Sequence, residues 1–281
     1  MSAALALAAA LAAAQPGPAP APAPPSGEPI AVPANYRLVW RDEFSGRGLP
    51  NRRRWAYDTD VNRRGWHNNE LQYYAEARAR NSRLEGGRLV IEAHAERLDP
   101  RRFADHGGQA YTSARLVTRG RAAWTYGFFE IRAKLACGRG LWPAIWTLAA
   151  TPGAPWPAGG EIDIMEHVGQ DPGTVHQTIH TAAYNHVRGT QRAGQARIPD
   201  ACDAFHLYQL DWTRERLRMG IDGRTVFTFA RSDNPAEWPF DTPQYLILNL
   251  AVGGWAARDG IDPAAFPARM EVDYVRIWQA R

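Results

Sequence analysis

The sequence predicts an all-β protein whose strands form a β-sandwich. Short segments of β-branched, aromatic or alternating residues recur along the chain, and the sequence lacks helical periodicity of useful length. The chain contains 25 Gly and 21 Pro, as expected where many turns join short strands. It also contains 11 Trp, 10 Tyr and 9 Phe, which are side chains suited to the core of a sheet protein.

The N-terminal region predicts export followed by a linker. Residues 1–14 are almost entirely Ala and Leu, which is typical of the apolar part of a secretory signal peptide, and residues 12–14 offer a small-residue cleavage site. The usual basic residues are missing, so an Ala-rich disordered tail is the alternative. Residues 15–35 are rich in Pro and Ala and predict an extended linker. We therefore expect a secreted or periplasmic protein with a single domain over residues 36–281.

Strand patterns follow one another through that domain. Residues 126–135 alternate apolar and charged side chains, as a half-buried strand does, whereas residues 62–74 are polar and aromatic and predict a loop. Asp222-Gly223 predicts the tight turn of a hairpin. Many short strands at close spacing favour a sandwich. The predicted strands cover residues 36–44, 88–93, 111–117, 126–135, 141–148, 159–167, 174–181, 205–212, 216–221, 225–229, 245–252 and 270–278.

Charge and hydropathy exclude two classes of partner. The formal net charge is +4, and the basic residues are nearly all Arg, with Lys134 the single lysine. These Arg are scattered, whereas nucleic-acid-binding proteins usually cluster their basic residues. Beyond the N-terminus, no apolar run approaches the roughly 20 residues that a membrane-spanning helix needs. We expect no nucleic-acid partner, no membrane span and a monomer.

Two cysteines, Cys137 and Cys202, lack the spacing of a metal site. In an exported chain they would be able to form one disulfide. Two free, buried thiols are an equally good interpretation, and both stay open.

The most informative stretch is Gly159–His167, which places Glu161, Asp163 and Glu166 among Ile and Met residues. Apolar, β-forming neighbours predict a strand that is buried on one side and presents acids on the other. Close carboxylates repel each other and shift each other's pKa. A strand that keeps three of them together is a candidate active site, and an edge strand with solvated acids is the alternative.

The spacing of these acids predicts a local irregularity. On a regular strand Glu161 and Asp163 share a face, while Glu166 points to the other. A β-bulge at Ile164–Met165 would restore all three to one face. The two Glu Cα atoms would then lie about 13 Å apart, and converging side chains of roughly 3–4 Å each would bring the carboxyls to about 5–6 Å. Retaining glycosidases need about 5–5.5 Å, and inverting enzymes need more.

Eight motifs in order resemble glycoside hydrolase family 16, in particular its bacterial endo-β-1,3-glucanases, or laminarinases. Each motif is modest alone, but their joint order is specific and spans nearly the whole domain. They are Trp40–Phe44, Asn68–Tyr74, Tyr111–Ser113, Tyr126–Glu130, Trp142–Trp146, Gly160–Glu166, Asn249–Gly254 and Val272–Arg276.

The resemblance implies a jelly-roll sandwich of two antiparallel sheets with a concave substrate cleft. It implies that Glu161 is the nucleophile, Glu166 the acid/base and Asp163 their electrostatic partner in an endo-acting, retaining hydrolase of β-1,3-glucan. It also favours the bulge, because the β-1,3-glucanases of the family carry the extra Met-type residue. No cofactor is required for this chemistry.

Three tryptophans are candidates for binding sugar rings. Trp142 and Trp146 share one face of their strand and, by resemblance, line the cleft, with core packing as the alternative. Trp255 follows a Gly-Gly pair in a predicted loop. Laminarinases often continue here with Trp-Pro-Gly, whereas this chain reads Trp-Ala-Ala-Arg, so the contacts on this side depart from the family pattern.

Polar residues in the same motifs are the remaining candidates for substrate binding. By resemblance, His180 contacts the site from the next strand, and a purely structural histidine is the alternative. Asn68, Glu70, Arg115 and Asn249 would hydrogen-bond sugar hydroxyls.

A structural Ca²⁺ on the convex face is a further expectation from the resemblance. It would use backbone oxygens and one carboxylate, a ligand type that calcium prefers. The matching positions are Glu43, Gly87 and Asp273.

Alternatives to the β-1,3-glucanase interpretation lie in the same family and outside catalysis. A family 16 enzyme acting on mixed-linkage glucan, agarose or carrageenan would keep the same acids, as would a transglycosylase. A non-catalytic β-glucan-recognition domain would share the sandwich, but such domains tend to lose one or more acids. All three acids are present here.

Overall fold

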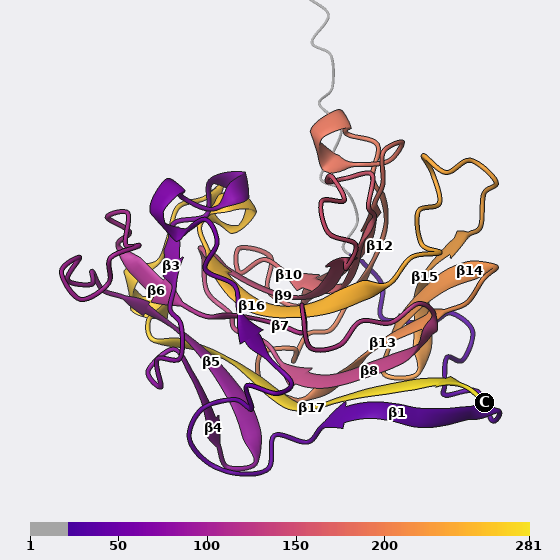
Figure 1. Ribbon diagram of the computed structural model, residues 1–281, viewed down its shortest axis with the longest axis horizontal. Coiled ribbons are helices and arrows are strands. Elements are labelled where there is room, and N and C mark those ends of the chain that lie inside the picture. Colours follow the sequence, from indigo (N-terminus) through magenta and orange to yellow (C-terminus); the bar gives the residue numbers. More distant parts are fainter. Residues whose placement is uncertain (1–21) are drawn as a thin grey trace, which may run out of the picture.

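Two β-sheets packed face to face form the computed structural model, which describes residues 22–281 (Figure 1). The expected signal peptide, residues 1–14, and the start of the linker lie outside the described residues. The prediction of an all-β sandwich is confirmed. Within residues 22–281, no helix has the length and apolar character needed to cross a membrane.

The larger sheet has ten strands. They are β1 (Tyr36–Asp42), β3 (Gln72–Tyr74), β4 (Ser82–Glu85), β5 (Arg88–Ala95), β6 (Tyr111–Ser113), β8 (Gly127–Lys134), β13 (His206–Trp212), β14 (Arg216–Ile221), β15 (Arg224–Ala230) and β17 (Ala268–Ala280). The order is β15-β14-β13-β8-β17-β5-β6-β3, with β1 beside β17 and β4 beside β5. The pair β3–β6 is parallel and departs from the predicted antiparallel pattern.

The smaller sheet has seven strands in the order β12-β11-β10-β9-β16-β7-β2. They are β2 (Ala56–Tyr57), β7 (Arg115–Val117), β9 (Leu141–Ala149), β10 (Glu161–His167), β11 (Thr174–His180), β12 (Arg192–Arg197) and β16 (Gln244–Val252). Short 3₁₀ helices occur in the loops: η1 (Asn62–Arg64), η2 (His67–Asn69), η3 (His186–Arg188), η4 (Gly254–Ala257) and η5 (Pro263–Ala265).

The smaller sheet carries the functional face. Its inner side packs against the larger sheet, and its outer side is open between two raised rims (Figure 1). Helices η2 and η4 rise on one side and the loop carrying η3 rises on the other. This arrangement gives the predicted concave face.

The segment predicted as one strand over residues 111–117 is two strands. Its first half, β6, pairs with β5 in the larger sheet, and its second half, β7, pairs with β16 in the smaller sheet. The chain changes sheet at Ala114, which is fully buried. The residue types of this segment do not reveal the change, because strand-forming residues continue through both halves.

Part of the predicted linker packs on the domain. Ile30 is 1% exposed, and its N–H donates to the carbonyl oxygen of Gly223 at 3.0 Å. The N–H of Thr225 donates in turn to the carbonyl oxygen of Glu28 at 2.9 Å. The packed chain therefore begins before Tyr36, because one apolar side chain in the Pro-rich segment fills a site beside the β14–β15 hairpin.

The predicted bulge lies in β10. Asp163 pairs with Thr178 of β11 and Glu166 pairs with His176, so Ile164 and Met165 together face the single residue Gln177. Both bulge residues are fully buried in the core between the sheets. The extra residue returns Glu166 to the open face, as the chemistry required.

Gln177 stabilises the bulge from the opposite strand. A bulge leaves ladder groups unpaired, and the buried Gln177 side-chain amide donates to the carbonyl oxygen of Ile164 at 2.9 Å. The same amide lies 3.3 Å from the carbonyl oxygen of Gly220 in the other sheet. One side chain thereby joins the bulge to the layer beneath it.

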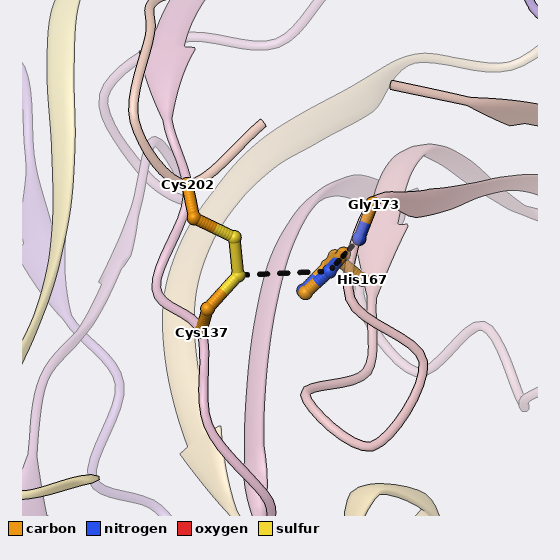
Figure 2. Close-up of a disulfide and its surroundings, with 4 residues drawn as sticks. All are labelled: Cys137, His167, Gly173 and Cys202. Atoms are coloured by element: carbon orange, nitrogen blue, oxygen red, sulfur yellow. Dashed lines mark hydrogen bonds between the residues drawn. A yellow bond between two sulfur atoms is a disulfide. The ribbon is translucent and has the colours of Figure 1, made fainter. Parts of the chain in front are cut away.

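A disulfide joins Cys137, which follows β8, to Cys202, which precedes β13, so the question that the sequence left open is answered (Figure 2). Figure 2 also shows His167, the last residue of β10, with its Nε2 atom 3.8 Å from Cys137 Sγ. Nε2 accepts the N–H of Gly173 at 3.1 Å. Burial lowers the pKa of His167 to about 4, which keeps the ring a neutral acceptor. These contacts fix the end of the strand that carries the acids.

We predict that Gln177→Leu lowers the free energy of unfolding by about 1–3 kcal/mol, the cost of an unsatisfied buried carbonyl. It should also lower kcat at least tenfold, because displacement of the bulge misplaces a carboxyl group. Chemical denaturation and kinetics measure both. The matched control is Gln195→Leu on β12, where the side chain is exposed and little change is expected. Equal behaviour of the two variants would contradict this role of Gln177.

Candidate active site

Three carboxyl groups share the open face of β10. Glu161 and Glu166 are half-buried, and Asp163 between them is 2% exposed. Their neighbours across the ladders are Leu148 of β9 and His180 of β11 beside Glu161, and Ala144 and His176 beside Glu166. The bulge thus places two partly accessible glutamates on either side of a buried aspartate.

Glu161 accepts one indole hydrogen bond and lies close to Asp163 and His180. The indole N–H of Trp156, from the loop before β10, donates to its Oε2 atom at 2.6 Å. Polar side-chain atoms of Glu161, Asp163 and His180 all lie within 4.8 Å of one another. His180 Nε2 is 3.3 Å from Asp163 Oδ2, so the predicted contact of His180 with the site is present.

Glu166 has its own indole partner. Trp142 Nε1 donates to Glu166 Oε1 at 3.1 Å. The Trp142 ring meets Trp255 edge-on, with centroids 5.7 Å apart, and Trp255 in turn meets His176 at 4.9 Å. Three rings therefore form a wall beside Glu166.

Burial raises the pKa of every acid in this group. For Glu166, burial raises the pKa to about 7; His180 lowers it, Glu161 raises it, and the Trp142 hydrogen bond lowers it. Burial and then Asp163 raise the pKa of Glu161 to about 8, above that of Glu166, while His180 and Trp156 act in the opposite direction. Burial and then Glu166 hold the pKa of Asp163 well above its usual range. The three acids therefore share protons near neutral pH, and catalysis needs one of these protons on the acid catalyst while the nucleophile is ionised.

Two hollows meet at the acids. The first, of about 500 Å³, contains Glu161 and extends past Trp146 toward Tyr245. The second, of about 660 Å³, contains both glutamates and extends past Trp142 toward Trp255. Asn68, Glu161 and His186 line both hollows. The cleft is thus continuous across the acids, with one tryptophan of β9 on each side.

Arg115 supports the floor of the first hollow. Its guanidinium lies between the rings of Trp66 and Trp146, at 4.9 and 4.7 Å from their centroids. Its Nε atom is 3.0 Å from Asp58 Oδ2, and both residues are buried. Arg115 lines the hollow, and its contacts with these three protein groups hold it there; its predicted hydrogen bonds to sugar hydroxyls stay a prediction.

Glu70 and Asn249 belong to a hydrogen-bond chain that runs behind Trp146. Trp146 Nε1 donates to Asn249 Oδ1 at 2.7 Å, and Asn249 Nδ2 donates to the hydroxyl of Tyr74 at 3.0 Å. That hydroxyl donates to Glu70 Oε2 at 3.2 Å, and Gln72 Nε2 donates to the same oxygen at 2.7 Å. Glu70 also lines the first hollow, and burial raises its pKa. This series of hydrogen bonds fixes the orientation of the Trp146 ring.

Asn68 and Trp255 lie where two loops cross at the rim. Asn68 has a left-handed backbone with φ 57°. A Cβ atom on Gly254 would lie 2.7 Å from the carbonyl oxygen of Asn68 and 3.2 Å from the Trp142 ring. Glycine is therefore required there, and the contact brings Trp255 into the second hollow.

Several residues of the site escape the sequence patterns. Trp156 is 42% exposed and the His186 ring packs against it at a tilt, with ring centroids 5.0 Å apart, yet Trp156 comes from an irregular loop and His186 from the one-turn helix η3. A sequence signal for Trp156 exists: the Trp156-Pro157 pair lies two residues before Gly159-Gly160, and so places an aromatic residue close to the catalytic strand. The other residues are Asp58, Trp66, His176 and Gln177, whose roles depend on contacts between distant segments.

The residues expected to hold calcium lie in or next to strands of the larger sheet and line neither hollow of the cleft. Strand β17 pairs with β5 up to Val272 and with β1 from Val275, so Asp273 lies where it changes partner. Glu43 follows β1 and Gly87 precedes β5. The carboxylate of Glu43 accepts both Arg276 donors, at 2.9 and 2.8 Å, and Arg132 donates to Asp273 Oδ2 at 2.7 Å.

The class defined by this fold and site is a glycoside hydrolase with paired glutamates in an open cleft. Residues 66–276 match the sequence profile of Glycosyl hydrolases family 16. The match covers most of the chain, so this protein belongs to that family.

Known relatives agree in sequence and in structure. A "Beta-glucanase" of Rhodothermus marinus is 52% identical over 255 residues, which cover 87% of this chain and 86% of the relative. A crystal structure of a non-specific endo-β-1,3(4)-glucanase of family 16 superposes with a TM-score of 0.88 at 54% identity, covering 92% of this chain and 96% of that one. The laminarinase of Rhodothermus marinus gives 0.81 at 49% identity, with coverage of 87% and 97%. The predicted jelly roll is thereby confirmed.

We predict that Arg115→Met lowers the free energy of unfolding by about 3 kcal/mol at pH 7, because it leaves the Asp58 carboxylate buried without its nearest partner. Arg119, at 3.5 Å, remains as a weaker one. Adding Asp58→Asn should recover part of the loss in a double-mutant cycle followed by urea unfolding. Simple additivity of the two single changes would contradict the coupling.

Proposed function

We propose that this protein is a retaining endo-β-1,3-glucanase in which Glu161 is the nucleophile and Glu166 is the acid/base. The observation that carries the proposal is the bulge in β10, which turns both glutamates onto one face of an open cleft. Membership of family 16 supports the retaining mechanism. The relatives named above support the substrate class.

In the first step, a carboxylate oxygen of Glu161 attacks the anomeric carbon of the bound sugar on the side opposite the leaving oxygen. The bond from that carbon to the glycosidic oxygen breaks, and the proton of Glu166 passes to the leaving oxygen. The raised pKa of Glu166, about 7, keeps this proton in place near neutral pH. The product of the step is a glycosyl-enzyme ester on Glu161.

In the second step, Glu166 acts as a base. Esterification removes the negative charge of Glu161, which had raised the pKa of Glu166, so this pKa falls. Glu166 takes a proton from water, the water oxygen bonds to the anomeric carbon, and the ester bond to Glu161 breaks. Two inversions leave the anomeric configuration unchanged.

The shape of the cleft supports attack within a chain. Hollows continue on both sides of the acids, and each contains a tryptophan of β9 whose indole is already hydrogen-bonded. Flat indole faces suit the faces of glucosyl rings. A polysaccharide can therefore lie across the face with sugars on both sides of the cleaved bond.

A second candidate substrate is mixed-linkage β-1,3-1,4-glucan. The relative that is 54% identical is a non-specific endo-β-1,3(4)-glucanase, and its Glu-to-Ser variant has been crystallised with a 1,3-β-D-cellobiosyl-glucose at its active site. All three acids are present on the open face, which argues against a function limited to glucan recognition.

We also propose that the enzyme acts outside the cytoplasm as a monomer. The disulfide Cys137–Cys202 supports the compartment, since such bonds persist in oxidising surroundings. The apolar composition of residues 1–14 supports export. N-terminal sequencing of the mature protein and its mass in solution test the two statements.

A structural Ca²⁺ is proposed where β17 changes partner. Both carboxyl oxygens of Glu43 accept from Arg276, which leaves its backbone oxygen, with that of Gly87, for the ion. Asp273 accepts from Arg132 through Oδ2 only, so its Oδ1 atom supplies the carboxylate ligand. This donor set fits calcium. The ion would stabilise the join between β1 and β5 and take no part in the chemistry.

Product analysis on laminarin, lichenan, agarose and carrageenan tests the function. We expect oligosaccharides from laminarin, a smaller or comparable yield from lichenan, and none from the other two. Glu166→Gln should abolish turnover of these polysaccharides, and Glu161→Ser should remain folded without hydrolysing them. Release from agarose or carrageenan alone would overturn the substrate class, and wild-type activity in Glu166→Gln would overturn the role of Glu166.

The calcium proposal predicts that adding Ca²⁺ to protein stripped with a chelator raises Tm by about 2–4 °C, as expected for roughly 1 kcal/mol of binding linkage. Asp273→Asn should abolish that increment. Arg132→Gln is the matched control, because it removes the same ion pair and leaves the carboxylate. A Tm increment that survives in Asp273→Asn would place the ion elsewhere, and the absence of any increment in wild type would exclude it.

A further inference from the structure

Each catalytic glutamate accepts a hydrogen bond from one indole, and the two indoles come from different elements. Trp156 lies in the loop between β9 and β10 and donates to Glu161 Oε2 at 2.6 Å. Trp142 lies in β9 itself and donates to Glu166 Oε1 at 3.1 Å. In both cases the indole contacts one of the two carboxyl oxygens, Oε2 of Glu161 and Oε1 of Glu166.

The surroundings of each indole hold its N–H in place. Trp142 is fixed by the edge of Trp255, at 5.7 Å and 89°, and by the close approach of Gly254. Trp156 packs against His186 at 5.0 Å and against His180 at 6.1 Å. The first indole is therefore part of the sheet, and the second is held by a histidine pair at the rim.

We propose that Trp156 and Trp142 are positioning residues with opposite tasks: the Trp156 N–H holds Glu161 as an oriented carboxylate for attack, and the Trp142 N–H orients Glu166 so that its other oxygen carries the transferred proton. This inference rests on the roles proposed above for the two glutamates. It assigns Trp142 a task besides sugar stacking and gives Trp156 a direct contact with the nucleophile.

The same type of hydrogen bond has opposite consequences at the two acids. An N–H donor favours the charged form of a carboxyl group, so removing it raises the pKa. Glu161 must be ionised to attack, so a raised pKa of Glu161 moves the acidic limb of the pH profile to higher pH. Glu166 must be protonated to donate its proton, so a raised pKa of Glu166 moves the basic limb of the pH profile to higher pH.

Other charged groups face the acids and set the background on which the indoles act. They stay unchanged when an indole is replaced by a phenyl ring. These groups are Asp163 on β10, His176 and His180 on β11, His186 in η3, Glu70 and Arg115 across the first hollow, and Arg258 in the second.

The test is the pH profile of kcat/KM on laminarin for wild type, Trp156→Phe and Trp142→Phe, with folding checked by circular dichroism. In Trp156→Phe the acidic limb should move up by about one pH unit while the basic limb stays, which narrows the profile. In Trp142→Phe the basic limb should move up by about the same amount, which broadens it. Both variants keep an aromatic ring in the cleft.

The matched control is Trp238→Phe. Trp238 also donates its indole N–H to a carboxylate, Asp241, at 3.0 Å, but it does not line either hollow of the cleft. Neither limb should move in that variant. Trp156→His, which keeps a ring N–H, should leave the acidic limb closer to wild type than Trp156→Phe does.

Lower activity in both Phe variants with unmoved limbs would overturn the inference, as would a shift of the same limb in both. Trp156 is 42% exposed, so Trp156→Phe is expected to fold. An acidic limb that stays at its wild-type position in this variant is sufficient to overturn the proposal. Failure of the proposed β-1,3-glucanase function is distinguishable from failure of this inference, because the wild-type protein would then release no products from laminarin.

Discussion

The requirement on which this structure depends is that two carboxyl groups five positions apart in a strand must face the same way. A regular strand forbids this, because its side chains alternate. The bulge at Ile164–Met165 supplies the extra residue, and both bulge side chains are anchored in the core. Gln177 satisfies the carbonyl oxygen that the bulge leaves unpaired. The position of β10 inside a seven-stranded sheet keeps this irregular strand fixed on both edges.

Around these acids, donors offset the cost of gathering negative charge in a partly buried site. The two indoles and His180 act against burial and mutual repulsion. Further from the acids, polar residues mainly orient aromatic ones: Arg115 lies between two tryptophan rings, and Asn249 holds the indole of Trp146. Substrate recognition thus depends on rings whose positions are fixed before any sugar arrives.

Much of the fold and the centre of the site could be predicted from sequence, because strand alternation and the spacing of acids are local properties. The bulge followed from the odd separation of Glu161 and Glu166. Contacts between distant segments could not be predicted. The change of sheet at Ala114 leaves no mark in the local residue pattern, and Ile30 packs within a composition typical of linkers. Trp156 reaches Glu161 through a loop with no periodicity. The short strands β2, β4 and β12 also lack a strong alternating pattern.

The central claim is that the bulge sets a carboxyl separation suited to double displacement. Proton NMR of the first products released from laminarin tests this most directly, because it reads the anomeric configuration before mutarotation. The account predicts that the β-anomer appears first and the α-anomer grows in later. Initial release of the α-anomer would mean single displacement through a water between more widely spaced acids, and would contradict the role given to the bulge.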